Sequence, residues 1–281
     1  MVKLVYLNSK YVKFQNAKIH IEDRGLQFSD SVYEVIPFYN KKLIDLIFHI
    51  NRLKFSLKEL NINYAINFNI FKKIFLKLIN NHNSKNGLIY LQITRGIQNR
   101  DHSYIKNLKP NIIIYILNRK LNFSKNTLKG VSAITCEDLR WKRRDIKSTS
   151  LLANVLAKNK ATSKKAYEAI LIDKGKITEA TASNVWIVKN NKLITHPANT
   201  DILKGVTRET IKQLILKNNL KFIEKYFTLK QMYEADEVFI TSSGNFVTPI
   251  IKVDSIKINK SKIGKITYKL AKLYSDSFIN G

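Results

Sequence analysis

The first 117 residues show two hydrophobic periods, and each period predicts a different type of element. Alternating apolar positions on both sides of Asn8-Ser9 and of Asn40-Lys41 predict two β-hairpins that turn at these pairs. Residues 88–95 and 111–117 are further strand-like runs. Apolar residues at helical spacing predict two helices, one carrying Phe48, Leu53, Leu57 and Leu60, the other with Phe71, Ile74, Phe75, Leu78 and Ile79 on one stripe. We therefore expect a small α+β domain over 1–117.

Beyond a polar connector at 118–129, the pattern changes to many short strands. Two helices are expected among them, at 149–164 and 207–218, and a terminal helix near Lys265. Many short strands are typical of a closed or barrel-like sheet. We expect a larger strand-rich domain over 130–281, with strands at 131–136, 168–173, 184–189, 192–196, 237–242 and 249–258.

The helix expected at 149–164 follows the stretch RWKRRDIKSTS, which carries several basic residues. Its apolar positions Leu151, Leu152, Val155 and Leu156 predict the face that packs on the domain core. Lys147 stands just before this helix, so it is not one of the lysines on the helix surface.

Composition narrows the class of protein. The chain is 44% hydrophobic and 25% charged, as expected of a globular protein. The single Cys136 excludes an intrachain disulfide framework and a cysteine-based zinc cluster, and we expect no metal. The longest apolar run, 112–117, is too short to cross a bilayer, and no secretory signal pattern precedes it. These features favour a cytoplasmic protein with no membrane contact.

The net charge of +28 points in two directions. A basic surface could bind nucleic acid, and a non-enzymatic nucleic-acid-binding protein is the alternative from another class. However, the chain has forty Lys and only nine Arg, and the lysines are spread without blocks. Lys, Asn and Ile share A/T-rich codons, so a compositional bias explains the charge more simply, and we expect no nucleic-acid partner.

The stretch EDRGLQFSDSVYEV combines residues that bind anions with residues typical of a turn. Arg24 and Gly25 lie in a polar loop that Asp23 could simply cap. Tyr33 and Glu34 follow in the next element, where they could be a core aromatic and a surface charge. Taken alone, the stretch is interpreted as a turn.

Two arginine–histidine pairs are further candidates in the first half. His49 and Arg52 are three residues apart on one helix face, so Arg52 could reach a phosphate or carboxylate, or be a solvated charge. Arg100 and His102 lie in a loop after the strand that ends near Thr94, and on an extended backbone they point the same way. That pair suits capture of a carboxylate, although an exposed basic loop is the alternative.

The second half offers an anion site and an acid. Gly205, Val206 and Thr207 stand at an expected helix start, where free N–H groups and the helix dipole favour an anion, unless Thr207 is a plain cap. Ser243 lies after an expected strand and could line the same phosphate or form an ordinary turn. Glu179, before a run of small residues, could bind a cationic ring nitrogen or cap the backbone.

A phosphate cradle, a carboxylate trap, an acid and a lysine are the needs of one cofactor chemistry, that of pyridoxal 5′-phosphate. A lysine amine forms a Schiff base with this cofactor, and an acid keeps its ring nitrogen protonated. Each signal is weak alone, and their coincidence in one chain predicts a pyridoxal-phosphate enzyme.

The wording and order of these stretches resemble the fold-type IV pyridoxal-phosphate enzymes, the family of branched-chain and D-amino-acid aminotransferases. The resemblance covers essentially the whole chain and includes EDRGLQFSDSVYEV, HINRL, TRGIQNRDH, IKSTSLLANVLAKNKA, TEATASNVW, THPANTDILKGVTRE and ITSSGNFVTPI. It implies a two-domain α+β fold with a small N-terminal domain and a larger barrel-like one. The Arg–x–His pair is the feature most similar to the D-amino-acid branch, while L-branched-chain aminotransferases and aminodeoxychorismate lyases of the same fold remain the alternatives.

The resemblance also assigns roles. By motif, Lys147 corresponds to the Schiff-base lysine that moves the substrate proton and Glu179 to the partner of the ring nitrogen. The phosphate cradle and ring support correspond to Arg52, Val206, Thr207, Ser243 and Leu203. The trap for the substrate α-carboxylate corresponds to Tyr33, Arg100 and His102. In the family the Arg–x–His loop reaches the neighbouring subunit's site, which implies a homodimer. The expected reaction is a ping-pong transamination between a D-amino acid, such as D-alanine, and a 2-oxo acid.

Overall fold

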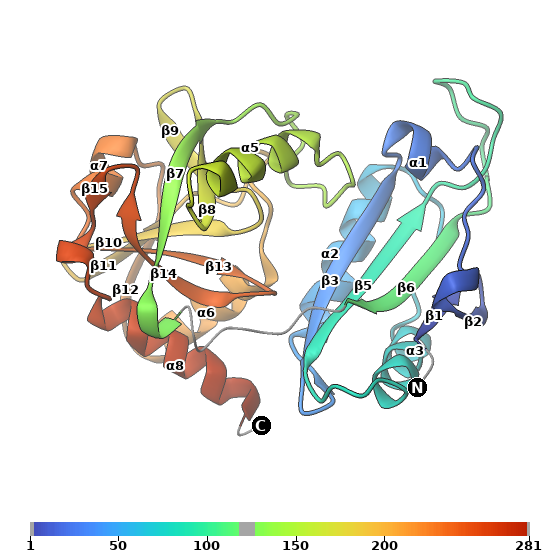
Figure 1. Cartoon of the computed structure of the whole chain (residues 1–281), viewed down its shortest axis with the longest axis horizontal. Coiled ribbons are helices and arrows are strands. Elements are labelled where there is room, and N and C mark those ends of the chain that lie inside the picture. The colour runs from blue at the N-terminus through green and yellow to red at the C-terminus, as the bar shows by residue number, and fades with distance from the viewer. Residues whose placement is uncertain (1–2, 118–126, 280–281) are drawn as a thin grey trace. The chain divides into compact units, whose positions relative to one another are not determined.

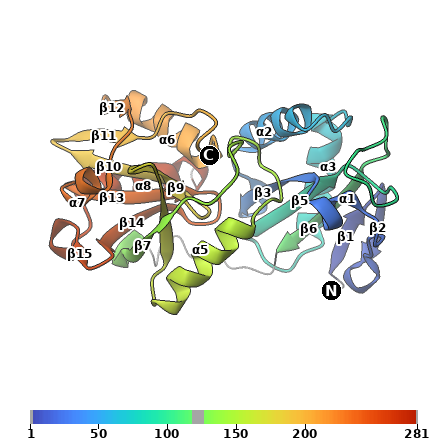
Figure 2. The same cartoon turned by 90° about the horizontal axis from the view of Figure 1, so that it is seen from above.

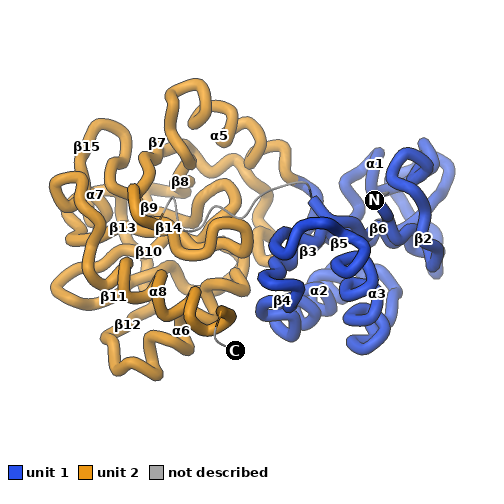
Figure 3. Tube along the Cα trace, turned by 60° about the horizontal axis from the view of Figure 1, so that its bottom comes forward, with its two compact units in different colours: residues 1–121, 146–150 blue, residues 122–145, 151–281 orange. Residues whose placement is uncertain are grey.

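The structure, a computed structural model, describes residues 3–117 and 127–279. It divides into two compact units (Figure 3). Unit 1 comprises Met1–Leu121 with Ile146–Ser150, and unit 2 comprises Asn122–Asp145 with Leu151–Gly281. The short segment Ile146–Ser150 therefore packs with unit 1, although both of its flanks belong to unit 2. Most of the connector predicted at 118–129 lies outside the described residues.

Unit 1 is built on a six-stranded antiparallel sheet in the order β2-β1-β6-β5-β3-β4. The strands are β1 (Leu4–Leu7), β2 (Lys10–Lys13), β3 (Ser31–Tyr39), β4 (Lys42–Leu43), β5 (Gly87–Thr94) and β6 (Asn111–Leu117). Helices α2 (Leu46–Glu59) and α3 (Phe68–Asn80) cover one face of the sheet (Figures 1 and 2). Two short elements, η1 (Phe14–Asn16) and α1 (Arg24–Phe28), complete the unit.

The predicted elements of unit 1 are confirmed. Both hairpins turn where expected, and the turn residues take left-handed φ values of 47° and 72° at Asn8 and Ser9. The apolar stripe of α3 is fully buried: Phe71, Ile74, Phe75, Leu78 and Ile79 all join the core between helices and sheet. Burial of each such side chain contributes about 1.5–3 kcal/mol, so this stripe fixes α3 on the sheet.

Unit 2 is built on a curled nine-stranded sheet in the order β12-β11-β10-β13-β14-β7-β8-β9, with β15 beside β14 (Figure 1). The strands are β7 (Val131–Glu137), β8 (Glu168–Asp173), β9 (Lys176–Ala180), β10 (Asn184–Lys189), β11 (Lys192–Thr195), β12 (Lys221–Glu224), β13 (Glu237–Ser242), β14 (Phe246–Val253) and β15 (Ile256–Lys257). The helices are α5 (Leu152–Ser163), α6 (Val206–Lys217), α7 (Leu229–Tyr233), η2 (Asn259–Ser261) and α8 (Lys265–Ile279).

The predicted packing face of α5 is wrong. Leu152, Val155 and Leu156 are 74, 49 and 59% exposed, and the helix buries Ala157 and Ala161 instead. These alanines pack against β7 and β8 in a small cluster of their own. Because alanine lets a helix axis approach a sheet closely, the small face of α5 meets the sheet and its leucines stay on the surface.

Two strands, β9 and β12, were not predicted. Glu179 was expected between a strand and a turn of small residues, and it lies inside β9. β9 has the sequence KITEA, and four of its five residues are buried, so it lacks the apolar–polar alternation expected of a half-buried strand. The predicted mixed α+β class is confirmed by the two helix-covered sheets. Within the described residues, no helix is long and apolar enough to span a membrane.

Candidate functional site

The Glu179 carboxylate in unit 2 is buried and accepts three hydrogen bonds from other residues. Glu179 is 4% exposed on β9. Its Oε1 accepts a short hydrogen bond from Arg140 Nη1 and a second from the Leu203 N–H at 3.1 Å. Its Oε2 accepts a hydrogen bond from Asn184 Nδ2 at 2.9 Å. Since a carboxylate offers about four acceptor positions, Oε2 has room for one more donor.

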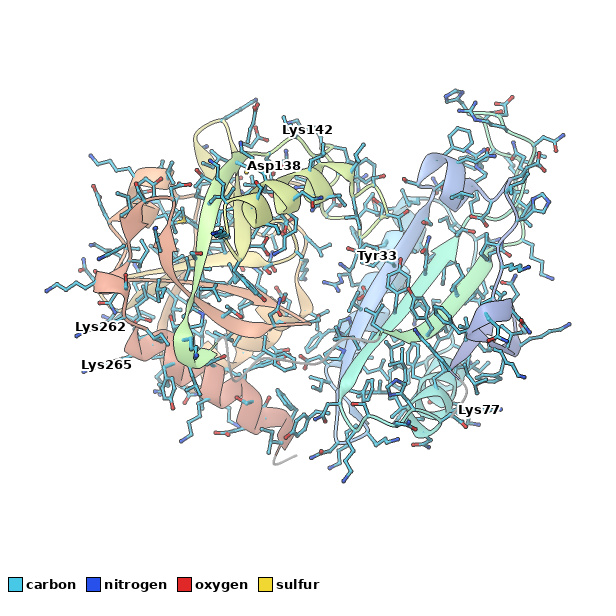
Figure 4. The ribbon with its side chains drawn as sticks, viewed as in Figure 1. Tyr33, Lys77, Asp138, Lys142, Lys262 and Lys265 are labelled. Carbon is cyan, nitrogen blue, oxygen red and sulfur yellow. The ribbon has the colours of Figure 1, made fainter. Side chains whose placement is uncertain are left out.

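Arg140 is shared between Glu179 and a second acid. Its Nε and Nη2 donate to the two oxygens of Asp138 at 2.9 and 2.8 Å. Asp138 Oδ2 also accepts from the Thr178 hydroxyl at 2.7 Å, beside the buried Arg144. Figure 4 shows Asp138 at the end of β7, with Lys142 further along the same segment. One guanidinium therefore holds two buried carboxylates in fixed positions.

This sharing sets the protonation of the pair. Burial raises the pKa of Glu179; the Arg140 charge and hydrogen bonds oppose the rise, and the Asp138 charge adds to it. For Arg140, burial works against the charged form, but the two carboxylates outweigh it and raise the pKa of the guanidinium. Arg140 therefore stays charged, and Glu179 is a buried carboxyl with more affinity for a proton than an exposed one.

Asn184 joins this acid to the start of α6. Its Nδ2 also donates to the Leu203 carbonyl at 2.9 Å. A Cβ on Gly205 would lie 2.0 Å from Asn184 Oδ1, so only glycine lets the helix start approach this amide. Gly205 is the N-cap of α6, and the buried residues Val206 and Thr207 follow it. The helix start is thus fixed next to Glu179 within unit 2.

The start of α6 contains an unsatisfied buried group. Among the described residues, Thr207 Oγ1 has no hydrogen-bond partner although it is buried. The first N–H groups of a helix also lack intrahelical acceptors. A buried hydroxyl without a partner costs about 1–3 kcal/mol. A phosphate oxygen would satisfy both kinds of donor, so this observation fits an anion held at Val206 and Thr207.

Ser243 lies in the turn between β13 and β14, which pair antiparallel next to β10. The side chain is partly exposed. Its hydroxyl remains a candidate for the same anion.

Lys147 is placed by unit 1. Its N–H donates to Ser56 Oγ at 3.1 Å, and its carbonyl accepts from the Tyr33 N–H at 3.0 Å. Its Nζ lies 4.1 Å from the centroid of the Tyr33 ring. The ring of Tyr33 also stacks on Tyr90 at 5.9 Å. Backbone bonds to both β3 and α2 thus fix the lysine against the face of the sheet that carries Tyr33.

On the opposite face of β3, Arg52 is held by a buried acid. Its Nε and Nη2 donate to both oxygens of Glu34, each at 2.8 Å, and His49 Nδ1 lies 2.7 Å from Glu34 Oε2. Since a carboxylate only accepts, Nδ1 carries the proton. Burial lowers the pKa of His49, so the ring is neutral. Glu34 therefore fixes the orientation of the Arg52 guanidinium.

The interpretation of Glu34 as a surface charge is wrong, because the residue is completely buried. Burial alone would raise its pKa, but Arg52 and His49 lower the pKa to about 2. The missed signal is the alternation of Val32, Glu34 and Ile36 on β3, which places all three on the core face.

Arg100 and His102 lie in an exposed loop between β5 and β6. Both contact the ring of Phe28: the guanidinium carbon of Arg100 is 5.1 Å from its centroid and the His102 ring 5.5 Å. The two side chains are thus held on one aromatic side chain. The predicted trap residues Tyr33, Arg100 and His102 are all in unit 1.

The predicted site residues divide between the units. Unit 1 contains Tyr33, Arg52, Arg100, His102 and Lys147, and unit 2 contains Glu179, Leu203, Val206, Thr207 and Ser243. Within unit 2, the Glu179 carboxylate, Leu203 and the start of α6 are brought together. The residues that sequence reasoning did not assign include Glu34, Asp138 and Asn184. Glu34 contacts Arg52 18 residues away, whereas Asp138 and Asn184 contact Arg140 and Glu179 within five residues.

Known proteins match this chain over nearly its whole length. Residues 31–253 match the family model described as amino-transferase class IV. The chain is 40% identical to the D-alanine aminotransferase of Bacillus licheniformis over 98% of this chain and 97% of that protein. It is 38% identical to the D-alanine aminotransferase of Staphylococcus aureus, strain MSSA476, over 95% and 94%.

Solved structures share the fold. A branched-chain amino acid aminotransferase of Escherichia coli superposes with a TM-score of 0.91 at 21% identity, covering 99% of this chain and 95% of the other. A putative 4-amino-4-deoxychorismate lyase of Legionella pneumophila gives 0.85 at 23% identity, covering 94% and 96%. At these identities the likeness concerns the fold alone.

Proposed function

The chain belongs to the class IV aminotransferase family, and from this premise we propose that it exchanges the amino group of a D-amino acid such as D-alanine with a 2-oxo acid on pyridoxal 5′-phosphate. The observation that carries the proposal is the group of residues around Glu179 in unit 2. A buried carboxylate with an open acceptor position stands beside a helix start with a buried hydroxyl that lacks a partner.

This arrangement fits pyridoxal phosphate, which has a ring nitrogen at one end and a phosphate at the other. Glu179 Oε2 would take the ring N–H, and the raised pKa of Glu179 suits a carboxyl that shares this proton. Val206, Thr207, Ser243 and Arg52 would hold the phosphate, and Leu203 would support the ring. When bound, the cofactor supplies an electron sink for negative charge at the substrate Cα.

The chain's own residues then orient the substrate and move its proton. Lys147 would anchor the cofactor through Nζ and, once released, take the proton from Cα. The Tyr33 ring lies against Lys147 Nζ and restricts where that amine can move. Tyr33, Arg100 and His102 would bind the α-carboxylate; a guanidinium offers it a planar pair of donors. This fixes which face of Cα is presented to Lys147.

The identity of Lys147 can be tested directly. Sodium borohydride should turn the yellow holoprotein colourless and attach the cofactor covalently to the peptide that contains Lys147. Lys147→Ala should fold, self-associate and lose transamination, while Lys142→Ala serves as a matched basic control. Label on another lysine, or none with cofactor in excess, would contradict the assignment.

The stereochemical part needs its own test. The relatives at about 40% identity are D-alanine aminotransferases, and the Arg–x–His pair favours the same substrates. D-Alanine and L-leucine should each be supplied with 2-oxoglutarate. We expect turnover with D-alanine; turnover with L-leucine alone would assign the chain to the branched-chain activity instead.

We also propose that two chains form a homodimer in which each Arg100–His102 loop serves the partner's site. Both residues are exposed, and so are the apolar side chains Leu152, Val155 and Leu156 of α5. Neighbouring exposed apolar side chains are typical of an interaction surface. The loop and the α5 face are therefore candidates for contact with a second copy.

Subunit mixing tests this proposal sharply. Lys147→Ala and Arg100→Ala chains are each expected to be inactive in their own dimers. If the loop acts on the partner, a mixed dimer contains one intact site, and random mixing should restore about a quarter of wild-type activity. No recovery, with mixed dimers demonstrated by differently tagged chains, would place the loop in its own chain's site.

A further inference from the structure

The loop with Arg100 and His102 is exposed, yet one buried side chain from outside the loop is bonded to its backbone. Arg24, at the start of α1, has a side chain that is 4% exposed. Its Nη1 donates to the carbonyls of Asp101 and Ser103 at 2.7 and 3.2 Å, and its Nη2 donates to the carbonyl of His102 at 3.2 Å. A single guanidinium thus binds three consecutive peptide carbonyls of the loop.

The same arginine is linked to the side chains of the loop through Phe28. The Arg24 guanidinium carbon lies 4.7 Å from the Phe28 ring centroid. Arg100 and His102 contact this ring at 5.1 and 5.5 Å. Attraction between cations and a ring face contributes roughly 0.5–1 kcal/mol at exposed sites. Arg24 therefore fixes the backbone, and Phe28 orients the two side chains.

Arg24 is itself held in place. Its Nε donates to Asp30 Oδ2 at 2.9 Å, and its own N–H donates to the Gly96 carbonyl at 2.9 Å. Asp23, the N-cap of α1, accepts from the Thr94 hydroxyl at 2.7 Å. A Cβ on Gly25 would lie 2.5 Å from Thr94 Cγ2, so glycine permits this close packing. These contacts fix α1 against the end of β5, and Arg24, at the start of α1, in turn holds the loop.

We propose that Arg24, with Phe28, is a positioning residue that holds the Arg100–His102 loop ready for the substrate α-carboxylate. The inference rests on the proposed function, because it assigns to that loop the role of carboxylate recognition. Without the three carbonyl bonds, the loop would sample other conformations. The apparent affinity for a carboxylate substrate falls in proportion to the fraction of loops in the competent conformation.

Arg24→Lys tests the inference, because lysine keeps the charge but lacks the planar fork that spans three carbonyls. We expect the KM for D-alanine to rise about tenfold with kcat little changed, as a tenfold smaller competent population requires. The constant for inhibition by propionate, a simple carboxylate, should rise in parallel. Cofactor affinity and borohydride labelling of Lys147 should stay as in the wild type.

Arg95→Lys is the matched control. Arg95 is also buried, pairs with the same Asp30 oxygen at 2.6 Å and, like Arg24, contacts the Tyr104 ring, but its Nη atoms donate to the carbonyls of Asn61 and Leu60 rather than to the 101–103 backbone. We expect a comparable loss of stability and an unchanged KM. If both variants raise KM equally, or neither does, the inference is overturned.

Phe28→Leu keeps the test decisive if Arg24→Lys does not fold. Leucine preserves apolar volume and removes the ring face shared by Arg100 and His102. We expect a smaller rise in KM than for Arg24→Lys, and an unchanged KM would contradict the role of the ring. Absence of cofactor on Lys147 in the wild type would instead refute the proposed function, so the two failures are distinguishable.

Discussion

In each unit a buried glutamate is paired with an arginine, yet the pKa values of the two carboxyl groups are shifted in opposite directions. In unit 1, burial would raise the pKa of Glu34, but Arg52 and His49 lower it to about 2. In unit 2, burial raises the pKa of Glu179, and Arg140 does not reverse the rise. Burial and an arginine partner are common to both sites, so neither explains the difference.

The difference lies in how each guanidinium is shared. Arg52 gives Nε and Nη2 to Glu34. Arg140 gives Nε and Nη2 to Asp138 and reaches Glu179 with Nη1. A competing carboxylate thus leaves Glu179 with affinity for a proton. Glu34 is suited to hold Arg52 in place, and Glu179 is suited to bind a protonated ring nitrogen.

Glu34→Ala should have the largest effect on stability. The substitution strands Arg52 and His49 in a buried site, and loss of one partner of a buried pair costs roughly 3–5 kcal/mol. Glu179→Ala should cost less, since Arg140 keeps its two bonds to Asp138. Urea unfolding of the cofactor-free proteins, followed by circular dichroism, measures both. An equal loss in the two variants would show that sharing of the guanidinium does not matter.

The pH dependence of unfolding should separate the same two residues by sign. A depressed pKa stabilises the fold above the ordinary value of 4.5, and this stability is lost as pH falls through about 2. Between these limits, the wild type should lose about 3 kcal/mol that Glu34→Gln does not lose. For Glu179 the contribution is present below 4.5 and lost as pH rises through its raised value.

Glu234→Gln is the control for these titrations, because Glu234 is an exposed acid near Lys230. It should leave the pH profile unchanged. Profiles for Glu34→Gln and Glu179→Gln that differ from wild type in the same direction would contradict the comparison.

Asp138→Asn should make the Glu179 site resemble the Glu34 site, where Arg52 gives both Nε and Nη2 to one carboxylate. Without the competing charge, Arg140 acts mainly on Glu179 and lowers its pKa. A less basic carboxylate binds a ring N–H less strongly, so cofactor affinity should fall by about tenfold or less. Absorbance titration of the cofactor-free protein measures this. Thr178→Val, which removes one bond to Asp138 but no charge, should have a smaller effect; equal losses would assign the change to packing.

The sequence predicts the elements whose signals are local. The stripe of α3 and the turns at Asn8 and Asn40 need only neighbouring residues, and all are confirmed. The packing face of α5 depends on how closely the helix approaches the sheet, and this face is formed by alanines rather than leucines. Local pattern cannot report this distance.

The residues of the candidate site also divide into those with a local sequence signal and those without one. Motifs name Lys147, Glu179 and Thr207, but the residues that tune them come from elsewhere in the chain. Arg140 is 39 residues from Glu179. Only Glu34 had a readable signal, its place in the alternation of β3.

Lys142→Ala should have the smallest effect. Lys142 Nζ lies 3.1 Å from Asp173 Oδ2, but its side chain is 73% exposed. Exposed ion pairs contribute about 0.2–1 kcal/mol and weaken with salt. Asp173 also keeps the buried Arg144, whose Nη2 donates to the same oxygen at 3.0 Å. The unfolding midpoint should therefore change little.

The salt dependence of stability provides a second test of this prediction. Any difference between Lys142→Ala and wild type should vanish at 1 M NaCl, where the Debye length is about 3 Å. The loss caused by Glu34→Ala should persist there, since a buried pair is screened much less. A loss of similar size and salt response in both variants would mean that burial does not distinguish these pairs.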